Sequence, residues 1–321
     1  MADNTLSTLN EIRIKIRRLT NNPSAAQITD ASIDDYINTF ILYDMPAYFK
    51  LPSLSETLTF FTSPHVGTYE NNTLDATNPL YNFKNKYTNV GAPVYIGGQK
   101  ASYHQSLEEF YNIYPKVNYK KLIGTGNGVT VDFTDTLDAF PVMTNQVTVS
   151  SINTAGNPLL AQDDGDGGFV GDVNPLSAFN YLTGQYYVSF TSAPANLESI
   201  WLSYVPYTAG QPTSVLFNQD KFIVRPIPDS GYRVEVQANR RPTELVAAGG
   251  MPELSEWCQY IALGSAIKVY QDRLNTEGVN TLMPEFKNQE ILIGRRKINQ
   301  NSQKRVSTIY ANEGNADPFV I

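Results

Sequence analysis

Three aspartates within four residues are the strongest candidates in this sequence for binding an ion. Asp163, Asp164 and Asp166 lie in the run Asp-Asp-Gly-Asp-Gly-Gly, and carboxylate oxygens are the ligands that Ca²⁺ prefers. The loop of an EF-hand ends in a bidentate glutamate, whereas Asn174 and Pro175 stand near that position here. A solvated acidic turn is therefore the favoured interpretation, a weak structural Ca²⁺ site is the alternative, and neither is catalytic.

The other residues that could do chemistry are isolated from one another. His65 and His104 have no neighbouring cluster with the spacing of metal ligands. The glycines between Gly124 and Gly128 lack the Lys-Ser/Thr of a phosphate-binding loop and precede an expected strand. Cys258 is the only cysteine, so it forms no intrachain disulfide, and its apolar neighbours predict a buried helix position. We expect no cofactor and no enzymatic activity.

Charge is distributed very unevenly along the chain. The net charge is −7, and the span from Leu122 to Asp220 contains nine acidic residues but no lysine or arginine. Such a region repels nucleic acid. The basic residues gather near the two ends of the sequence, at Arg13, Lys15, Arg17 and Arg18 and then at Lys287, Arg295, Arg296, Lys297, Lys304 and Arg305.

Each basic cluster has two interpretations. The first can contact DNA in a channel or a neighbouring subunit, or it is a solvated helix face. The second belongs to a strip that either docks on a partner or forms a disordered basic tail. The sequence ends in Phe319, Val320 and Ile321, and exposing these side chains to water is unfavourable, which favours docking.

No targeting or membrane segment is expected. The first fifteen residues lack the apolar stretch of a signal peptide, and no run approaches the 18 apolar residues of a membrane span. We therefore expect a protein that is assembled in the cytoplasm and makes no contact with a membrane.

Helical periodicity is confined to the two ends of the chain. Residues 5–20 and 30–46 place apolar residues at spacings of three and four. Residues 252–275 begin with proline and acids, which is typical of a helix N-terminus, and a further helix is expected over 283–299. A short helix is also possible within 103–114.

The middle of the chain has the pattern of antiparallel sheet. Short alternating runs are separated by Gly and Pro every eight to twelve residues, which is typical of sandwiches and barrels. The runs cover residues 57–61, 93–96, 129–133, 146–149, 185–190, 200–204 and 232–236.

The order helices, strands, helices predicts an α+β fold. In it, N- and C-terminal helices form a helical bundle, and a large antiparallel β-sandwich or barrel region is inserted between them. The expected domains are 1–46 with 245–303 for the helices and 47–244 for the inserted β domain, within which 124–206 is a sandwich module. An extended C-terminal tail covers 304–321.

Four segments resemble a small β-sandwich module that recurs in phage tail and neck proteins. They are GTGNGVTVDF from Gly124, FNYLTGQYYVSF from Phe179, TSAPA from Thr191 and IWLSY from Ile200. Thr183-Gly184 falls where a hairpin turn is needed between two strands. The resemblance implies a structural role in a virion.

Both ends of the chain resemble phage head-to-tail adaptor (connector) proteins. The similar segments are IRIKIRRL from Ile12 and ITDASIDDYIN from Ile28, followed late in the chain by YRVEV, RRPTEL, LSEW and AIKVYQDR, which begin at Tyr232, Arg240, Leu254 and Ala266. The resemblance implies a twelve-fold ring of identical subunits in the virion neck, with the portal protein and tail or nozzle proteins as partners. It also implies a C-terminal tail that reaches into the portal, and transient contact with the DNA that passes through.

Two other functions compete with the adaptor. A tail or baseplate decoration protein would bind host-surface carbohydrate through the β module, with Trp201 and the pair Tyr186-Tyr187 stacking on sugars. A cell-wall hydrolase is disfavoured because no convincing acid/base pair stands out. Terminal helices that pair with each other favour the adaptor.

Overall fold

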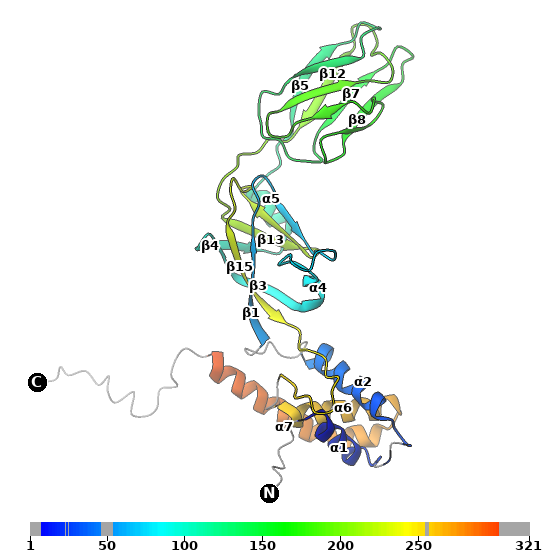
Figure 1. The fold of residues 1–321 in the computed structure, drawn as a ribbon, viewed down its shortest axis with the longest axis vertical. Helices are drawn as coiled ribbons and strands as arrows, with labels where there is room; N and C mark the ends of the chain where they lie inside the picture. Colours follow the sequence, from blue (N-terminus) through cyan, green and yellow to red (C-terminus); the bar gives the residue numbers. More distant parts are fainter. Residues whose placement is uncertain (1–7, 23, 25, 46–53, 254–256, 302–321) are drawn as a thin grey trace, which may run out of the picture. The chain divides into compact units, whose positions relative to one another are not determined.

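The structure is a computed structural model that describes residues 8–22, 24, 26–45, 54–253 and 257–301. The chain forms two compact units, and each is described by itself (Figure 1). The first unit comprises Met1–Thr57, Phe83–Val90 and Gln237–Ile321, and the second comprises Leu58–Asn82 and Gly91–Val236.

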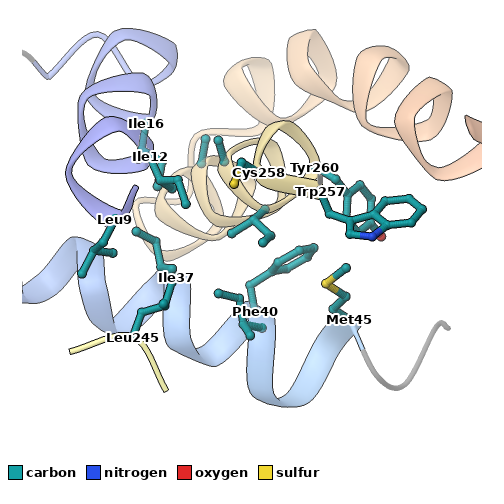
Figure 2. Packing of buried hydrophobic residues seen from close by; sticks show 14 of the residues in the cluster. Leu9, Ile12, Ile16, Ile37, Phe40, Met45, Leu245, Trp257, Cys258 and Tyr260 are labelled. Carbon is teal, nitrogen blue, oxygen red and sulfur yellow. The ribbon is translucent and has the colours of Figure 1, made fainter. Parts of the chain in front are cut away.

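The first unit has a hydrophobic core that is shared by helices from early and late in the sequence. Side chains from every one of these helices enter one buried cluster, and Figure 2 shows Ile12, Ile37, Phe40 and Tyr260 converging in it. Each fully buried aliphatic or aromatic side chain there contributes about 1.5–3 kcal/mol. The helices are α1 (Leu9–Leu19), α2 (Asp30–Thr39), the π-helix η1 (Phe40–Asp44), α6 (Cys258–Asp272) and α7 (Thr276–Asn301).

Side-chain caps mark where α1, α2 and α7 begin. Thr8 accepts a hydrogen bond from the backbone N–H of Glu11, whose carboxylate accepts one from the N–H of Thr8, so α1 starts with a capping box. The hydroxyl of Thr29 caps α2, because it accepts a hydrogen bond from the backbone N–H of Ser32. Asn275 accepts from the N–H of Gly278 at 2.9 Å and thereby starts α7 seven residues before the expected 283.

Helix α6 packs closely against the segment that follows α2. A Cβ on Gly264 would lie 2.2 Å from Cε2 of Phe40, so only glycine permits this approach. The Phe40 ring also meets Tyr260 edge-on, and the Tyr260 ring stacks on Phe286 at a centroid distance of 4.8 Å. Helix α6 begins at Cys258 and not at Pro252.

A seven-stranded sheet contains strands that are far apart in the sequence. It is mainly antiparallel, but β13 pairs with β4 in parallel, with Ser214 opposite Ser102. Two short helices, α4 (Phe83–Lys86) and α5 (Leu107–Ile113), lie in the connections. In spatial order the strands are β1 (Ser55–Phe61), β15 (Arg233–Arg240), β3 (Tyr87–Ile96), β4 (Gln99–His104), β13 (Ser214–Asn218), β14 (Lys221–Arg225) and β2 (Thr68–Glu70).

Two further sheets enclose a core of their own and form a β-sandwich. Inward residues of both sheets, among them Val149, Leu202 and Val188, belong to one buried cluster. The five-stranded sheet runs β5 (Tyr119–Thr125), β12 (Ser199–Tyr204), β7 (Thr148–Ile152), β8 (Pro158–Asp163) and β9 (Phe169–Gly171). The three-stranded sheet runs β10 (Ala178–Phe179), β11 (Gln185–Ser189) and β6 (Asp132–Thr136).

Glycines in the sandwich serve turns and a close backbone approach. Gly184 has a φ of 69° in the turn between β10 and β11. A Cβ on Gly126 would lie 2.1 Å from the carbonyl oxygen of Ala195, so the connection between β5 and β6 needs glycine there. This glycine-rich segment joins two strands and precedes no helix, so it has no resemblance to a phosphate-binding loop.

The predicted fold class, a helical bundle with an inserted sandwich or barrel region, is wrong. The fold is mostly β-sheet, with fifteen strands in three sheets among the residues that the structure describes, and the seven-stranded sheet curls into half a barrel. The physical reason is that strands pair across the whole chain: β1, which follows the N-terminal helices, neighbours β15, which precedes α6. The seven-stranded sheet is therefore part of the main body and not of an insertion between helices, whereas the predicted domain boundaries stay a prediction.

Candidate interaction surfaces

The basic cluster on α1 is largely engaged by α2. Nε of Arg13 donates to Asp34 at 2.6 Å, and the second guanidinium nitrogen donates to the other carboxylate oxygen, which makes a two-pronged ion pair. Arg17 donates to Asp30 at 2.6 Å. The hydrogen bonds that Arg13 donates to Asp34 raise the pKa of Arg13, and the hydrogen bond that Arg17 donates to Asp30 lowers the pKa of Asp30.

These ion pairs change the interpretation of the N-terminal cluster. The side chains of Arg13 and Arg17 are only 13% and 11% exposed, because they lie along α2. Arg18 is exposed and Lys15 is half-buried. Two of the four bases predicted to contact a channel or a subunit therefore hold helices of their own chain together, and Arg18 is the one fully open to a partner.

The second basic cluster begins on α7. Lys287 and Arg295 are exposed on this helix, while Ile293 and Phe286 on other faces of it pack into the helical core. Arg296 and Lys297 also belong to α7. The remaining predicted portal contacts, Lys304, Arg305, Phe319, Val320 and Ile321, lie outside the described residues.

The acidic turn is organised by hydrogen bonds from the protein. The carboxylate of Asp163 accepts from the hydroxyl of Tyr181 and from the backbone N–H groups of Gln146 and Gly165. Asp164 accepts from the N–H groups of Asp166 and Gly168, and these bonds lower the pKa of Asp164. Within the described part of the chain, no group of three His, Cys, Asp or Glu residues is placed to hold a metal ion.

The two histidines and the cysteine lie in separate surroundings. His65 is exposed, with Nδ1 3.0 Å from the hydroxyl of Tyr207, and His104 is buried against the ring of Phe110. Cys258 is buried in α6, as predicted, and burial raises the pKa of its thiol to about 11. A thiol with so high a pKa is a poor nucleophile at neutral pH.

The outer face of the five-stranded sheet exposes a row of large apolar side chains. Leu122 and Trp201 stand opposite each other on β5 and β12, Trp201 stands opposite Ser150 on β7, and Ser150 stands opposite Leu160 on β8. Leu122, Trp201 and Leu160 are 47%, 43% and 44% exposed. We call these three residues the apolar row. The sequence singles out Trp201 as a binding residue, but it does not identify Leu122 and Leu160, because sequence alone does not align strands.

The other sheet of the sandwich carries a polar groove. It measures about 520 Å³ and is lined by side chains of β6 and β11 with the turn before β11, including Asp135, Asn180, Gln185 and Tyr187. Tyr187 donates to Asp132 at 3.0 Å, whereas Tyr186 is buried. The structure therefore does not gather Trp201 with the two tyrosines, because they belong to different sheets.

Comparison with known proteins finds only distant structural likeness. No family model and no curated protein match the chain. Among solved structures, VP17, a capsid protein of bacteriophage P23-77, is similar over 62% of this chain and 91% of its own, with 11% identity and a TM-score of 0.21. A TM-score this low does not indicate a shared fold.

In the described residues, no helix is both long and apolar enough to cross a membrane.

Proposed function

We propose that this chain is a non-enzymatic structural protein of a phage virion. The observation that carries the proposal is the apolar row, because monomeric soluble proteins rarely expose contiguous apolar patches unless these bind something. Trp201 lies between Leu122 and Ser150, with Leu160 one strand further on, and an exposed tryptophan beside apolar neighbours is typical of the centre of a protein interface. The sandwich that carries the row resembles in sequence the module of phage tail and neck proteins.

Within that class, we propose the head-to-tail adaptor that forms a ring beneath the portal. The sequence resemblance of both chain ends to adaptors supports it, as does the cluster in which α1 and α6 share a core. In this role, identical subunits contact one another around a rotation axis. The bases of α7 face the portal protein, tail or nozzle proteins bind below, and DNA passes through the centre.

Imaging the neck of the virion at subunit resolution tests the adaptor. We expect a closed ring of copies directly beneath the portal, with α7 against it and the apolar row covered by a neighbouring subunit or tail protein. Copies at the tail tip or on the capsid surface would overturn the adaptor. Copies that leave the apolar row open to solvent would remove its main support.

The polar groove favours a second candidate, a decoration protein that binds host-surface carbohydrate. The lining of the groove includes the aromatic ring of Tyr187, the carboxylate of Asp135 and the amides of Asn180 and Gln185, which are groups that stack on sugar rings and hydrogen-bond their hydroxyls. Calorimetry with host-surface polysaccharide discriminates the two. Binding that is lost in Tyr187→Ala but kept in Trp201→Ala supports decoration, and no heat of binding supports the adaptor.

A further inference from the structure

Arg225, at the end of β14, is a buried cation without a carboxylate partner. Arg225 is 8% exposed, and its Nη1 donates to the backbone carbonyl of Val224 at 2.8 Å. No carboxylate of the described residues forms an ion pair with it, and the charged or polar groups that act on it are the phenols of Tyr111 and Tyr207. Burial lowers the pKa of this guanidinium. An unpaired buried charge is destabilising, so its presence needs an explanation.

Two cavities within the second unit share this guanidinium in their walls. They measure about 500 Å³ and about 370 Å³, and both are lined by Arg225, Tyr207, Met143 and Ile227. Arg225 lines both cavities, and the basic residues His65 and Lys116 line the smaller one. No aspartate or glutamate lines either cavity. The net charge of the chain is −7, so the charge in these cavities is opposite in sign to that of the chain as a whole.

The guanidinium of Arg225 occupies space that is free because residue 67 is glycine. A Cβ on Gly67 would lie 2.5 Å from Nη1 of Arg225. Any residue other than glycine would therefore push the guanidinium from its place. The backbone of Gly67 is fixed, since its carbonyl accepts from the N–H of Val224 at 3.0 Å. The cationic group is thus held at one position in the wall.

Aromatic side chains form part of the remaining walls. In the smaller cavity, the hydroxyl of Tyr207 lies 3.0 Å from Nδ1 of His65, and the ammonium of Lys116 lies 5.1 Å from the centre of the Tyr111 ring. Tyr114 and Phe140 belong to the lining of the larger cavity, as Arg225 does. A ligand in the larger cavity meets both a cation and aromatic rings.

We propose that these cavities form a binding site for a carboxylate that bears an apolar or aromatic group. The guanidinium is planar, matches a carboxylate with two parallel N–H donors, and has one of its N–H groups committed to Val224. A carboxylate would neutralise the buried charge, and its apolar part would cover Tyr114 and Phe140. This site is separate from the apolar row and goes beyond the proposed structural role.

Calorimetry on the full chain tests the site, with benzoate as the probe. Benzoate binds saturably, whereas neutral benzamide, which has the same shape, binds at least tenfold more weakly. Arg225→Met weakens benzoate binding at least tenfold, and Phe140→Ala, which removes a ring of the larger cavity, weakens it several-fold. Lys120→Ala, an exposed lysine outside the cavity linings, is the matched control and leaves it unchanged. Equal binding of benzoate and benzamide, or unchanged binding in Arg225→Met, overturns the proposal.

A second variant keeps the test decisive if Arg225→Met does not fold. Gly67→Ala leaves Arg225 in the sequence but displaces its guanidinium, a group at the end of a flexible side chain, so the fold survives and benzoate binding falls at least tenfold. Full affinity in Gly67→Ala contradicts the site. Inorganic phosphate that binds more tightly than benzoate overturns the assignment to a carboxylate. A glutamate-containing tripeptide that competes with benzoate identifies a protein segment as the source, and lack of competition identifies a small carboxylate.

Discussion

The helical unit and the sandwich handle charge in opposite ways. In the helical unit, bases find acids of the same unit: Arg13 pairs with Asp34, and Lys268 pairs with Asp44 at 2.6 Å. In the sandwich, Lys121 is the last base before a long acidic span, and Asp135 and Asp138 share it at 3.0 and 3.3 Å. Other sandwich acids accept from backbone N–H groups, as Asp164 does, or from tyrosine hydroxyls, as Asp132 and Asp163 do.

The two regions differ in the same way in their apolar surfaces. The apolar stripe of α1 is buried in the cluster of Figure 2, whereas the sandwich buries one face of its five-stranded sheet and exposes the apolar row on the other. The helical unit also exposes apolar side chains, among them Leu274 at 87% and Ile291 at 54%. What distinguishes the sandwich is that three of its exposed apolar side chains are aligned across one face of a sheet, and this alignment makes that face the stronger candidate for a partner.

The largest expected effect separates the two cores. Phe40→Ala removes a buried ring from the helical core and Phe190→Ala removes one from the sandwich core, so each destabilises its own region by about 3–5 kcal/mol. Calorimetry should show two unfolding transitions, each lowered by one variant only. A single transition that both variants lower equally would contradict the separation of the cores.

Overpacking in the helical core comes next. Gly264→Ala forces a methyl group into the Phe40 ring and should destabilise the protein by about 1–3 kcal/mol. Gly294→Ala in α7 is the control, because a Cβ there meets nothing within 4 Å, and it should stabilise by about 0.5–1 kcal/mol through helix propensity. Denaturant unfolding measures both. A neutral Gly264→Ala would show that α6 and Phe40 do not touch so closely.

The internal ion pairs give a smaller effect. Asp34→Asn leaves the guanidinium of Arg13 without its two-pronged partner, and we expect a loss of about 1.5 kcal/mol. Asp135→Asn in the sandwich should cost less, because Asp138 still pairs with Lys121 and exposed pairs contribute little. Urea unfolding of both variants measures the difference. A larger loss from Asp135→Asn would reverse the contrast between the two regions.

Acid should weaken both regions through different groups. The pKa of Asp30 is lowered by Arg17, and the pKa of Asp164 is lowered by backbone N–H groups. A lowered folded-state pKa gives stability that is present above the unfolded pKa, about 3.9, and lost as pH falls through the folded pKa. Melting temperatures between pH 6 and pH 2 should fall. Asp30→Asn and Asp164→Asn should each flatten the fall, and an unchanged slope would contradict the cause.

The smallest effect on folding is expected at the apolar row. Trp201→Ser should change the free energy of unfolding by less than about 0.5 kcal/mol, whereas Leu202→Ala, the fully buried neighbour, should cost about 2–5 kcal/mol. Trp201→Ser should nevertheless impair assembly into particles, although it leaves the free energy of unfolding unchanged. If Trp201→Ser destabilises as much as Leu202→Ala, the indole is part of a core and the apolar row is not an interface.

Local elements were predictable because their signals are local. The spacing of Leu9, Ile12 and Ile16 predicts the buried face of α1, and Thr183-Gly184 lies in the hairpin turn as expected. The sheet order was not predictable. The parallel contact between β4 and β13 joins residues more than a hundred positions apart, and alternation says which residues share a face but not which strands are neighbours.

The site residues show the same limit. Arg13 and Arg17 were recognised as a basic cluster, but their partners Asp34 and Asp30 lie on another helix, so the pairing came only from tertiary structure. Arg225 ends an ordinary strand sequence, Lys-Phe-Ile-Val-Arg, and nothing local reveals that it is buried. The glycine that makes room for it, Gly67, lies more than 150 residues away.

The first and last strands of the sandwich are hydrogen-bonded neighbours, with Tyr119 of β5 opposite Tyr204 of β12. The chain thus enters and leaves this module at nearly one point. A segment with adjoining ends can be removed, replaced or transplanted by joining two short connections, and the strands on either side keep their geometry. The sandwich can therefore be replaced as one unit. Its outer faces can differ between related proteins while the seven-stranded sheet that it is attached to keeps its structure.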